Sequence, residues 1–497
     1  MIDLFPLEIL TEIFWLAIIR DPRVGNARLD QAPLSISQVC STWRKASLNC
    51  PKLWSTLLLH LIKNEPPTSS KIIELMTLWY GRAKGDLPLS FSLSHYPKTI
   101  SGSIGGEIAK ALVPFSPRLS HVYFNVPRVD DLVPFLSQRI ELSAADPSDG
   151  NSPIPLLQKI EICVRYRSSK EFSYGNIFWF APALRDATMN ICSDFCVTSL
   201  SLSFPWTGLT QLTLSHTITA GLFSYLITQC LCLTHGSFMV GAEPGSWWQD
   251  EEQSEEEEHG QEEQNLPVVA PNLSSLRLRI YGSREAPVSV EDTMRRLILP
   301  SMQNLDLLVD DENVQLSSVI PSLPIHSATG STQLTRLVLV NIFLESKTEL
   351  LALLHACTAL ETLALQPLPH HTEEVLDVLQ NPIDSVPAPT LPSLAACVLV
   401  VDLQFAPKVI GILRSWMEDP ERRQALEAVT VYVYGGPSIG IDPASGVALK
   451  EIRERLGPWR EADMDGYVAT AKSGMVLRTR AVFKHFILLG SESDWFE

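Results

Sequence analysis

The sequence predicts an α/β protein in which a small helical module precedes a solenoid of strand–helix repeats. Three observations support this fold class: an apolar helix close to the N-terminus, a recurring L-x-x-L-x-L pattern, and amphipathic helices between its copies. The chain has 497 residues, of which 45% are hydrophobic, so it can bury a large core. Length alone would suggest about three domains, but a repeat array forms one body. We expect the module at residues 1–60 and the solenoid at 61–497.

A helix is predicted at the start of the chain, in the stretch FPLEILTEIFW. Pro6 suits the first turn of a helix, because its missing N–H would have no partner there. Leu7, Leu10 and Phe14 then recur at helical spacing. Further apolar residues fall between them, so the helix is hydrophobic over more than the stripe that one core requires. A second surface is therefore expected to cover it.

Two further short helices are expected after a polar loop at residues 20–32. Pro33 begins the first of them, and Ser41 is the predicted N-cap of the second. Pro51 ends the pair, and Trp54 follows before a strand. This order predicts a compact group of three helices.

A resemblance to a known family rests on four stretches near the N-terminus. They are Pro6-Leu7-Glu8-Ile9-Leu10, Ile13-Phe14, Val39-Cys40-Ser41-Thr42-Trp43-Arg44 and Pro51-x-Leu53-Trp54. Together they resemble the F-box of fungal F-box proteins with leucine-rich-repeat-like bodies, over about residues 4–58. Phe5 departs from the pattern, since a Leu usually precedes the Pro. The resemblance implies a module that docks on a Skp-type adaptor and so joins a cullin-RING ubiquitin ligase.

The resemblance also implies which residues contact the adaptor. The expected contacts are Pro6, Leu7, Ile9, Leu10, Ile13, Phe14, Val39, Cys40 and Trp43. The last three are expected to divide between docking and the core of the module. The alternative is that residues 4–58 only cap the N-terminal end of a solenoid. Excess apolar surface favours docking, because a cap should present a polar outer face.

From about residue 75 the chain repeats a helix followed by a short strand. In the clearest copy, strands begin at Leu334 and Leu360, a period of 26 residues. Ser346 and Glu349 between them predict a capping box. The apolar positions of the enclosed helix are Leu350, Leu351, Leu354 and Cys357.

Other copies of the pattern predict more strands. These begin at Leu119, Leu157, Leu184, Leu209, Leu273, Met302, Leu394 and Leu426. Chance alone would give roughly ten such triplets in this composition, so the helices between them carry the prediction. Helix starts are predicted at Thr219, at Ser289 with Asp292, and at Thr372, and the second helix would include Met294 and Leu297.

Stacked repeats of this kind resemble an irregular leucine-rich-repeat solenoid, with parallel strands on the concave side and helices on the convex side. In the last 50 residues we expect a helix near Val447 to Leu456 and a strand near Met475 to Phe486.

The net charge of −17 argues against nucleic acid or an anionic membrane as the main partner, because both attract clustered Lys and Arg. Residues 250–264 contain nine acidic and no basic residues, within an insert at about 241–265 that is expected to be a disordered loop. A role in binding a basic partner is the alternative for this insert.

Nine cysteines without regular spacing fit buried reduced thiols, and so cytosol or nucleus. No signal peptide or transmembrane helix is predicted.

Signatures of catalysis or cofactor binding are not found. The stretch GSIGGEIAK, residues 102–110, lacks the phosphate-loop spacing and predicts a loop entering a helix. His370 and His371 are adjacent and have no further ligands placed by sequence, so no metal site is predicted.

We therefore expect a protein without enzymatic activity or cofactor. The resemblance implies the substrate receptor of a Skp-cullin-F-box ubiquitin ligase, which binds the adaptor through its N-terminal helices and an unidentified protein target through its repeats. The alternative is a stand-alone repeat scaffold whose N-terminal helices serve only as a cap.

Overall fold

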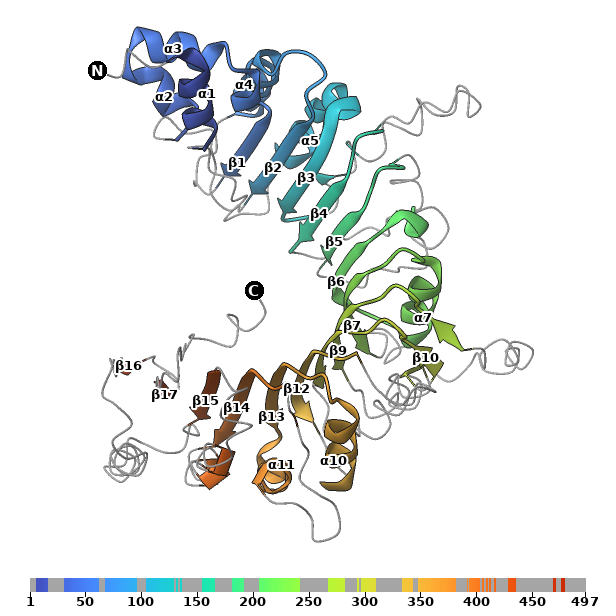
Figure 1. Ribbon diagram of the computed structural model, residues 1–497. Coiled ribbons are helices and arrows are strands. Elements are labelled where there is room, and N and C mark those ends of the chain that lie inside the picture. Colours follow the sequence, from blue (N-terminus) through green and yellow to red (C-terminus); the bar gives the residue numbers. More distant parts are fainter. Residues whose placement is uncertain are drawn as a thin grey trace, which may run out of the picture. The chain divides into compact units, whose positions relative to one another are not determined.

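The computed structural model divides into two compact units, residues 1–216 with 229–233, and residues 217–228 with 234–497 (Figure 1). The structure describes residues 6–16, 31–61, 68–95, 104–128, 131–132, 135, 154–165, 181–191, 205–241, 267–281, 293–294, 296–309, 333–342, 347–380, 391, 393–402, 405, 408–409, 411–412, 415–416, 428–434, 468–470 and 475–478. Each unit is treated by itself.

Unit 1 begins with helices and continues as a parallel sheet. Its helical elements are α1 (Leu7–Leu16), α2 (Leu34–Val39), α3 (Ser41–Leu48), η2 (Pro51–Trp54), α4 (Ser69–Arg82), α5 (Ile104–Leu112), η3 (Val113–Arg118) and η7 (Trp206–Gly208). Its strands are β1 (Thr56–Leu61), β2 (Leu89–His95), β3 (Leu119–Val126), β4 (Lys159–Val164), β5 (Asp186–Ile191) and β6 (Gln211–Ile218), whose last two residues belong to unit 2. The strands pair in chain order, each parallel to the next.

Unit 2 continues the same theme. Its helical elements are α7 (Ala220–Gln229), α10 (Lys347–Ala356), η12 (Pro369–His371) and α11 (Thr372–Gln380). Its main-sheet strands are β7 (His235–Gly241), β9 (Ser275–Tyr281), β11 (Asn304–Val309), β12 (Arg336–Ile342), β13 (Thr362–Pro367), β14 (Ala396–Asp402), β15 (Ala428–Tyr434), β16 (Val468–Thr470) and β17 (Met475–Arg478). Strands β7 to β15 pair in parallel, whereas β17 and β16 are antiparallel.

The strands begin two residues later than the leucine pattern predicts, because the first leucine of each copy lies in a turn. The Leu273 N–H donates to the carbonyl of Ala270 (3.4 Å), and the Leu360 N–H donates to that of Cys357 (3.2 Å). The strands then start at Ser275 and Thr362. The predicted period survives this shift, since Arg336 of β12 pairs with Thr362 of β13.

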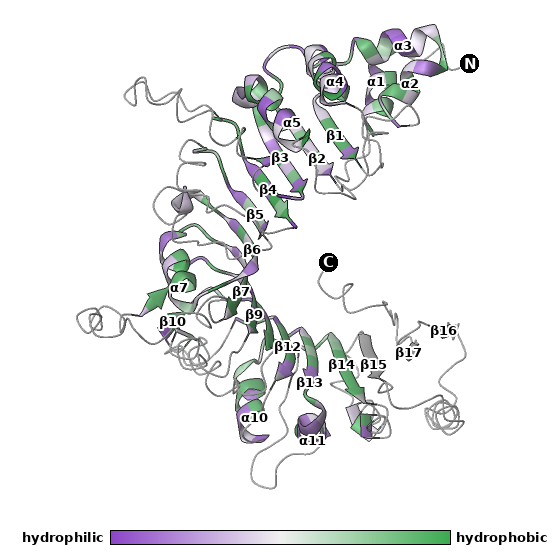
Figure 2. Ribbon diagram, turned by 180° about the vertical axis from the view of Figure 1, so that it is seen from behind, coloured by the Kyte–Doolittle hydropathy of each residue, from purple (hydrophilic) through white to green (hydrophobic). Residues whose placement is uncertain are grey.

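Side chains alternate between the two faces of the sheet along most strands, as in β4, β9 and β11. Figure 2 shows hydrophilic and hydrophobic segments alternating along β3 and β4. Leu276, Leu278 and Ile280 of β9 are buried. The residues between them form the other face, which we call the open face. Figure 1 shows α10 and α11 following one another along one side of the unit 2 strands.

Three predicted helices are confirmed and one prediction is wrong. Thr219 precedes α7 and accepts a hydrogen bond from the Leu222 N–H (3.3 Å), as an N-cap does. α10 and α11 lie where the apolar spacing placed them. Leu297, expected on a helix, instead forms β10 (Leu297–Ile298) with β8 (Val268–Val269). Burial explains this error, because Leu297 and Met294 are buried as either a helix or this ribbon would require.

The stretch at residues 102–110 enters α5, as predicted. Several other expectations lie outside the described residues. These are the cap at Ser346, the helix start at Ser289 and Asp292, the strand start at Leu426, the acidic insert, and the helix near Val447 to Leu456. The strand expected from Met475 is present as β17 as far as Arg478.

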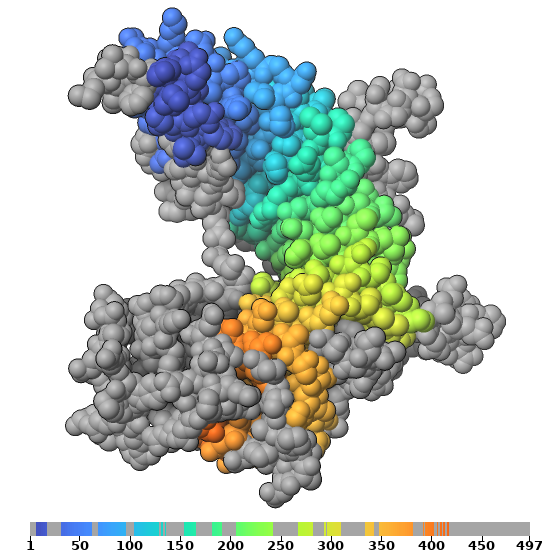
Figure 3. Space-filling view, in the orientation of Figure 1, coloured from blue at the N-terminus to red at the C-terminus, as the bar shows by residue number. Residues whose placement is uncertain are grey.

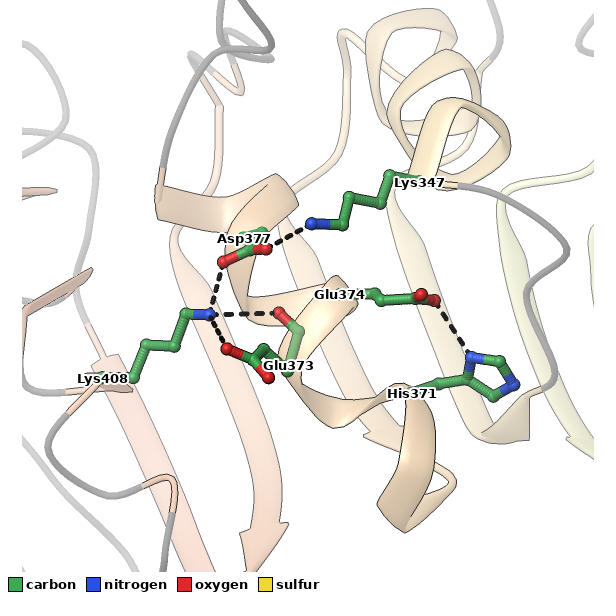
Figure 4. Close-up of polar contacts among 6 residues, drawn as sticks. All are labelled: Lys347, His371, Glu373, Glu374, Asp377 and Lys408. Atoms are coloured by element: carbon green, nitrogen blue, oxygen red, sulfur yellow. Dashed lines mark hydrogen bonds and ion pairs between the residues drawn. The ribbon is translucent and has the colours of Figure 1, made fainter.

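A charged cluster links neighbouring helices of unit 2 (Figure 4). The Asp377 carboxylate of α11 accepts hydrogen bonds from Lys347 of α10 and is also paired with Lys408. The Lys408 ammonium also donates to a carboxylate oxygen of Glu373 (3.4 Å). Burial would raise the pKa of Asp377, but the hydrogen bonds and charges of the two lysines outweigh it and hold this pKa below its ordinary value. One carboxylate thus joins three successive segments of the helix layer.

We predict that Asp377→Asn destabilises unit 2 by about 1 kcal/mol at neutral pH, because it leaves two lysines facing each other. Since the pKa of Asp377 is lowered in the folded state, its contribution is complete above the ordinary value of 3.8 and is lost as the pH falls through the folded value. Urea unfolding of both proteins at pH 7 and at pH 3 measures this. The control is Glu373→Gln, whose side chain is 70% exposed and should matter less. An equal penalty for Asp377→Asn at both pH values would contradict the electrostatic account.

Candidate protein-binding surfaces

The N-terminal module is a packed unit that joins the first repeat through tryptophans. The rings of Phe14 on α1 and Trp43 on α3 lie 4.9 Å apart. Trp54 is fully buried, donates to the Ser47 carbonyl (2.9 Å) and packs edge-on against Trp79 of α4, at 4.9 Å. These contacts hold the three N-terminal helices against the start of the sheet.

The predicted cap of α3 differs by one residue. The Cys40 side chain, rather than Ser41, accepts a hydrogen bond from the Trp43 N–H (Sγ to N, 3.4 Å). Cys40 has extended backbone angles, which an N-cap requires, whereas Ser41 is already helical. Cys40 is half-buried and is therefore tied into the structure of the module.

The structure divides the expected adaptor contacts into two groups. Pro6, Leu7, Ile9, Ile13 and Val39 are exposed, and Trp43 is half-buried. Leu10 and Phe14 are 3% and 1% exposed, so they lie in the core of the module and cannot present a docking surface in this conformation. Helical spacing explains the division, because Leu10 and Phe14 share one face of α1.

A second apolar face of α1 remains uncovered by the described residues. Ile9, Ile13 and Leu16 recur at i, i+4 and i+7 and are 47%, 47% and 79% exposed. We call these three residues the α1 stripe. Figure 3 shows atoms of α1, in the darkest blue, at the surface. Exposed apolar side chains grouped on one helix are typical of an interaction site.

The open face of unit 1 carries balanced charges. Register pairs His121 of β3 with Lys159 of β4, and Lys159 with Asp186 of β5. The Lys159 ammonium lies 2.8 Å from the Asp186 carboxylate. Burial and the charge of Lys159 lower the pKa of His121, whereas Asp186 acts in the opposite direction. This imidazole is therefore mostly neutral at pH 7.

The open face of unit 2 carries a group of arginines. Asp306 of β11 accepts from Arg277 Nη2 of β9 (3.3 Å) and from Arg336 Nε of β12 (3.1 Å). The guanidinium of Arg279, two residues after Arg277, lies 4.8 Å from the centroid of the Tyr281 ring. We call Arg277, Arg279 and Arg336, with Asp306, the arginine patch. Sequence analysis missed it, because its members come from three strands.

Groups capable of covalent or metal chemistry do not gather at either surface. Burial raises the pKa of the Cys230 and Cys397 thiols to about 12, so both stay protonated and unreactive at neutral pH. In the described part of the chain, no three His, Cys, Asp or Glu side chains are placed to hold a metal. His371 instead contacts Glu374 (Nδ1 to Oε2, 3.0 Å; Figure 4). Among the described helices, none is long and apolar enough to cross a bilayer.

Comparison with known proteins yields one solved structure to report. No protein-family model matches the chain, and no curated protein does. The chain is similar to the leucine-rich repeat-containing protein LegL7 from Legionella pneumophila, at 10% identity and a TM-score of 0.30, over 75% of this chain and 98% of that one. The strand order and register of this chain themselves make its body a leucine-rich-repeat-like array of parallel strands.

We predict that Phe14→Ala lowers the local stability of the module by about 3 to 5 kcal/mol, because it leaves a cavity beside Trp43. Ile13→Ala on the same helix should change it by less than about 1 kcal/mol, because half of that side chain is already exposed. Hydrogen exchange of the α1 and α3 amides, followed by mass spectrometry, compares the two variants. Similar exchange in both would show that Phe14 is not a core residue.

Proposed function

We propose that the protein is the substrate receptor of a Skp-cullin-F-box ubiquitin ligase. In this proposal the α1 stripe and its surroundings bind a Skp-type adaptor, and the open face of the sheet binds a protein target. The protein performs no bond chemistry itself. It raises the effective concentration of the target near the ubiquitin donor, whose chemistry belongs to other subunits.

The observation that carries this proposal is the exposure of the α1 stripe on a helix whose opposite face is fully packed. A helix that only capped a solenoid would need a polar outer face to remain soluble. α1 instead places Ile9, Ile13 and Leu16 outward. The F-box resemblance of residues 4–58 supplies the kind of partner, and the intracellular setting expected from the cysteines is compatible with it.

A stand-alone scaffold is the second candidate function, and one observation favours it. Trp54 fixes the module firmly to α4 and to the start of the sheet, as an end cap requires. In that case the open face would still bind a protein, but no adaptor would bind α1. The two candidates therefore differ in a single measurable contact.

We predict that purified Skp-type adaptor from a fungus binds the full-length protein and that Ile9→Asp with Ile13→Asp abolishes this binding. Two charges placed on the α1 stripe would be buried without partners in the complex, which costs several kcal/mol. Biolayer interferometry with immobilised adaptor measures the affinity, and circular dichroism shows that the variant remains folded. Leu10 and Phe14 are unsuitable targets, because their replacement would disrupt the core.

The matched control is Leu231→Asp, because Leu231 is 54% exposed and lies outside the module. This variant should bind the adaptor as the unaltered protein does. Retained binding by the stripe variant would exclude the α1 stripe as the contact. Failure of the unaltered protein to bind would exclude the receptor function and leave the scaffold.

A further inference from the structure

We propose that the arginine patch of unit 2 binds an extended, carboxylate-rich segment of a partner protein. This deepens the proposed function by giving the chemical class of its target, and it rests on that function for its biological role. The binding itself involves only the open face, so it can be measured without the adaptor.

The patch concentrates positive charge on a chain that is otherwise acidic. Three arginines surround one aspartate, which leaves two positive charges in excess, whereas the whole chain has a net charge of −17. Arg277 and Arg336 keep 40% and 44% of their side chains exposed, and Asp306 keeps 15%. The anion between the arginines is therefore the more enclosed group, and the cations face outward.

Asp306 also fixes the geometry of the two guanidinium groups. Its Oδ2 accepts from Arg277 Nε (3.4 Å) and Nη2 (3.3 Å), and its Oδ1 accepts from Arg336 Nε (3.1 Å). Holding the guanidiniums in place reduces the entropy that they would lose on binding a ligand. Planar, preoriented guanidinium groups suit carboxylates, which they can bind through two parallel hydrogen bonds.

The surroundings of the patch favour a polypeptide over a small anion. Register aligns Arg279 with Met239 of β7 on one side and with Leu308 of β11 on the other, and Leu308 with Val340 of β12. A row of mainly apolar side chains thus runs across the strands beside the row that contains Arg277 and Asp306. An extended segment that alternates acidic and apolar residues matches both rows, because its side chains alternate direction as those of a strand do.

Nucleic acid is a poorer match for this surface. A duplex or single strand presents a continuous series of phosphates, which a protein neutralises with many cations. The patch offers three arginines with a carboxylate among them, and the net charge of the chain repels a long polyanion. The open face of unit 1 provides a useful contrast, because Lys159 there is matched by Asp186 and leaves no such excess.

The test uses fluorescence anisotropy of full-length protein with a fluorescein-labelled nonapeptide in which glutamate and leucine alternate. The first control peptide replaces every glutamate with glutamine. The protein variants are Arg336→Gln, Asp306→Asn and, as the matched control, Lys159→Gln on the open face of unit 1. A 20-nucleotide single-stranded DNA serves as a competing polyanion.

We expect the glutamate peptide to bind at least about tenfold more tightly than the glutamine peptide, and Arg336→Gln to weaken it about tenfold, because a charge-assisted hydrogen bond is lost. Asp306→Asn should strengthen binding about threefold, because it removes the one negative charge of the patch. This gain would not follow from a merely structural role. Lys159→Gln should change nothing, and added salt should weaken the binding.

Equal affinity for the two peptides would overturn the proposal, as would an Arg336→Gln variant that binds normally. Displacement of the peptide by equimolar DNA would show a general polyanion surface and would also overturn it. Adaptor binding is measured on the same preparations. Peptide binding without adaptor binding would leave this inference standing and remove the receptor function, and the reverse result would do the opposite.

Discussion

Neighbouring repeats are joined by a backbone carbonyl that accepts two N–H groups from the next repeat. In unit 2 the Thr234 carbonyl accepts from Ser274 and Ser275, both at 3.0 Å, and the Ser274 carbonyl accepts in turn from Gln303 (2.8 Å) and Asn304 (2.9 Å). The same arrangement continues through Gln303, Thr335 and Glu361. Because the bond involves only the backbone, it fixes the register of the sheet and tolerates almost any side chain at these positions. Side-chain constraints then fall on the buried row alone.

That division explains which parts of the fold the sequence could predict. Strands were predictable because every buried row needs apolar residues at alternate positions, and the turn before it needs one more, such as Leu273. Their starts were displaced because a leucine pattern does not distinguish the turn from the strand. The ribbon of β8 and β10 was mistaken for a helix for a related reason, since Leu297 is buried in either form. The arginine patch could not be predicted at all, because Arg277 and Asp306 meet only through a register across 29 residues.

The N-terminal helix shows the same limit on a smaller scale. Its apolar residues predicted that more than one surface must cover it, but the assignment of Leu10 and Phe14 to the outer surface depended on resemblance and not on packing. In the structure Phe14 meets Trp43 inside the module, and Ile13 beside it faces outward. A difference of one position on a helix turns a side chain by about 100 degrees, so neighbouring apolar residues can serve opposite purposes. Only the position of α3 decides between them.

Tight attachment of the module and exposure of the α1 stripe are compatible demands. A receptor must hold its target at a defined distance from the partner that its other end binds, because proximity has an effect only when both sites can be occupied together. Trp54 makes a rigid joint of this kind, since its indole bonds to Ser47 within the module and packs on Trp79 of the first repeat. A loosely tethered module would forfeit that geometry, whereas a pure cap would have no reason to leave Leu16 exposed. The same tryptophan that ends the module therefore gives an apolar outer face on α1 a mechanical use.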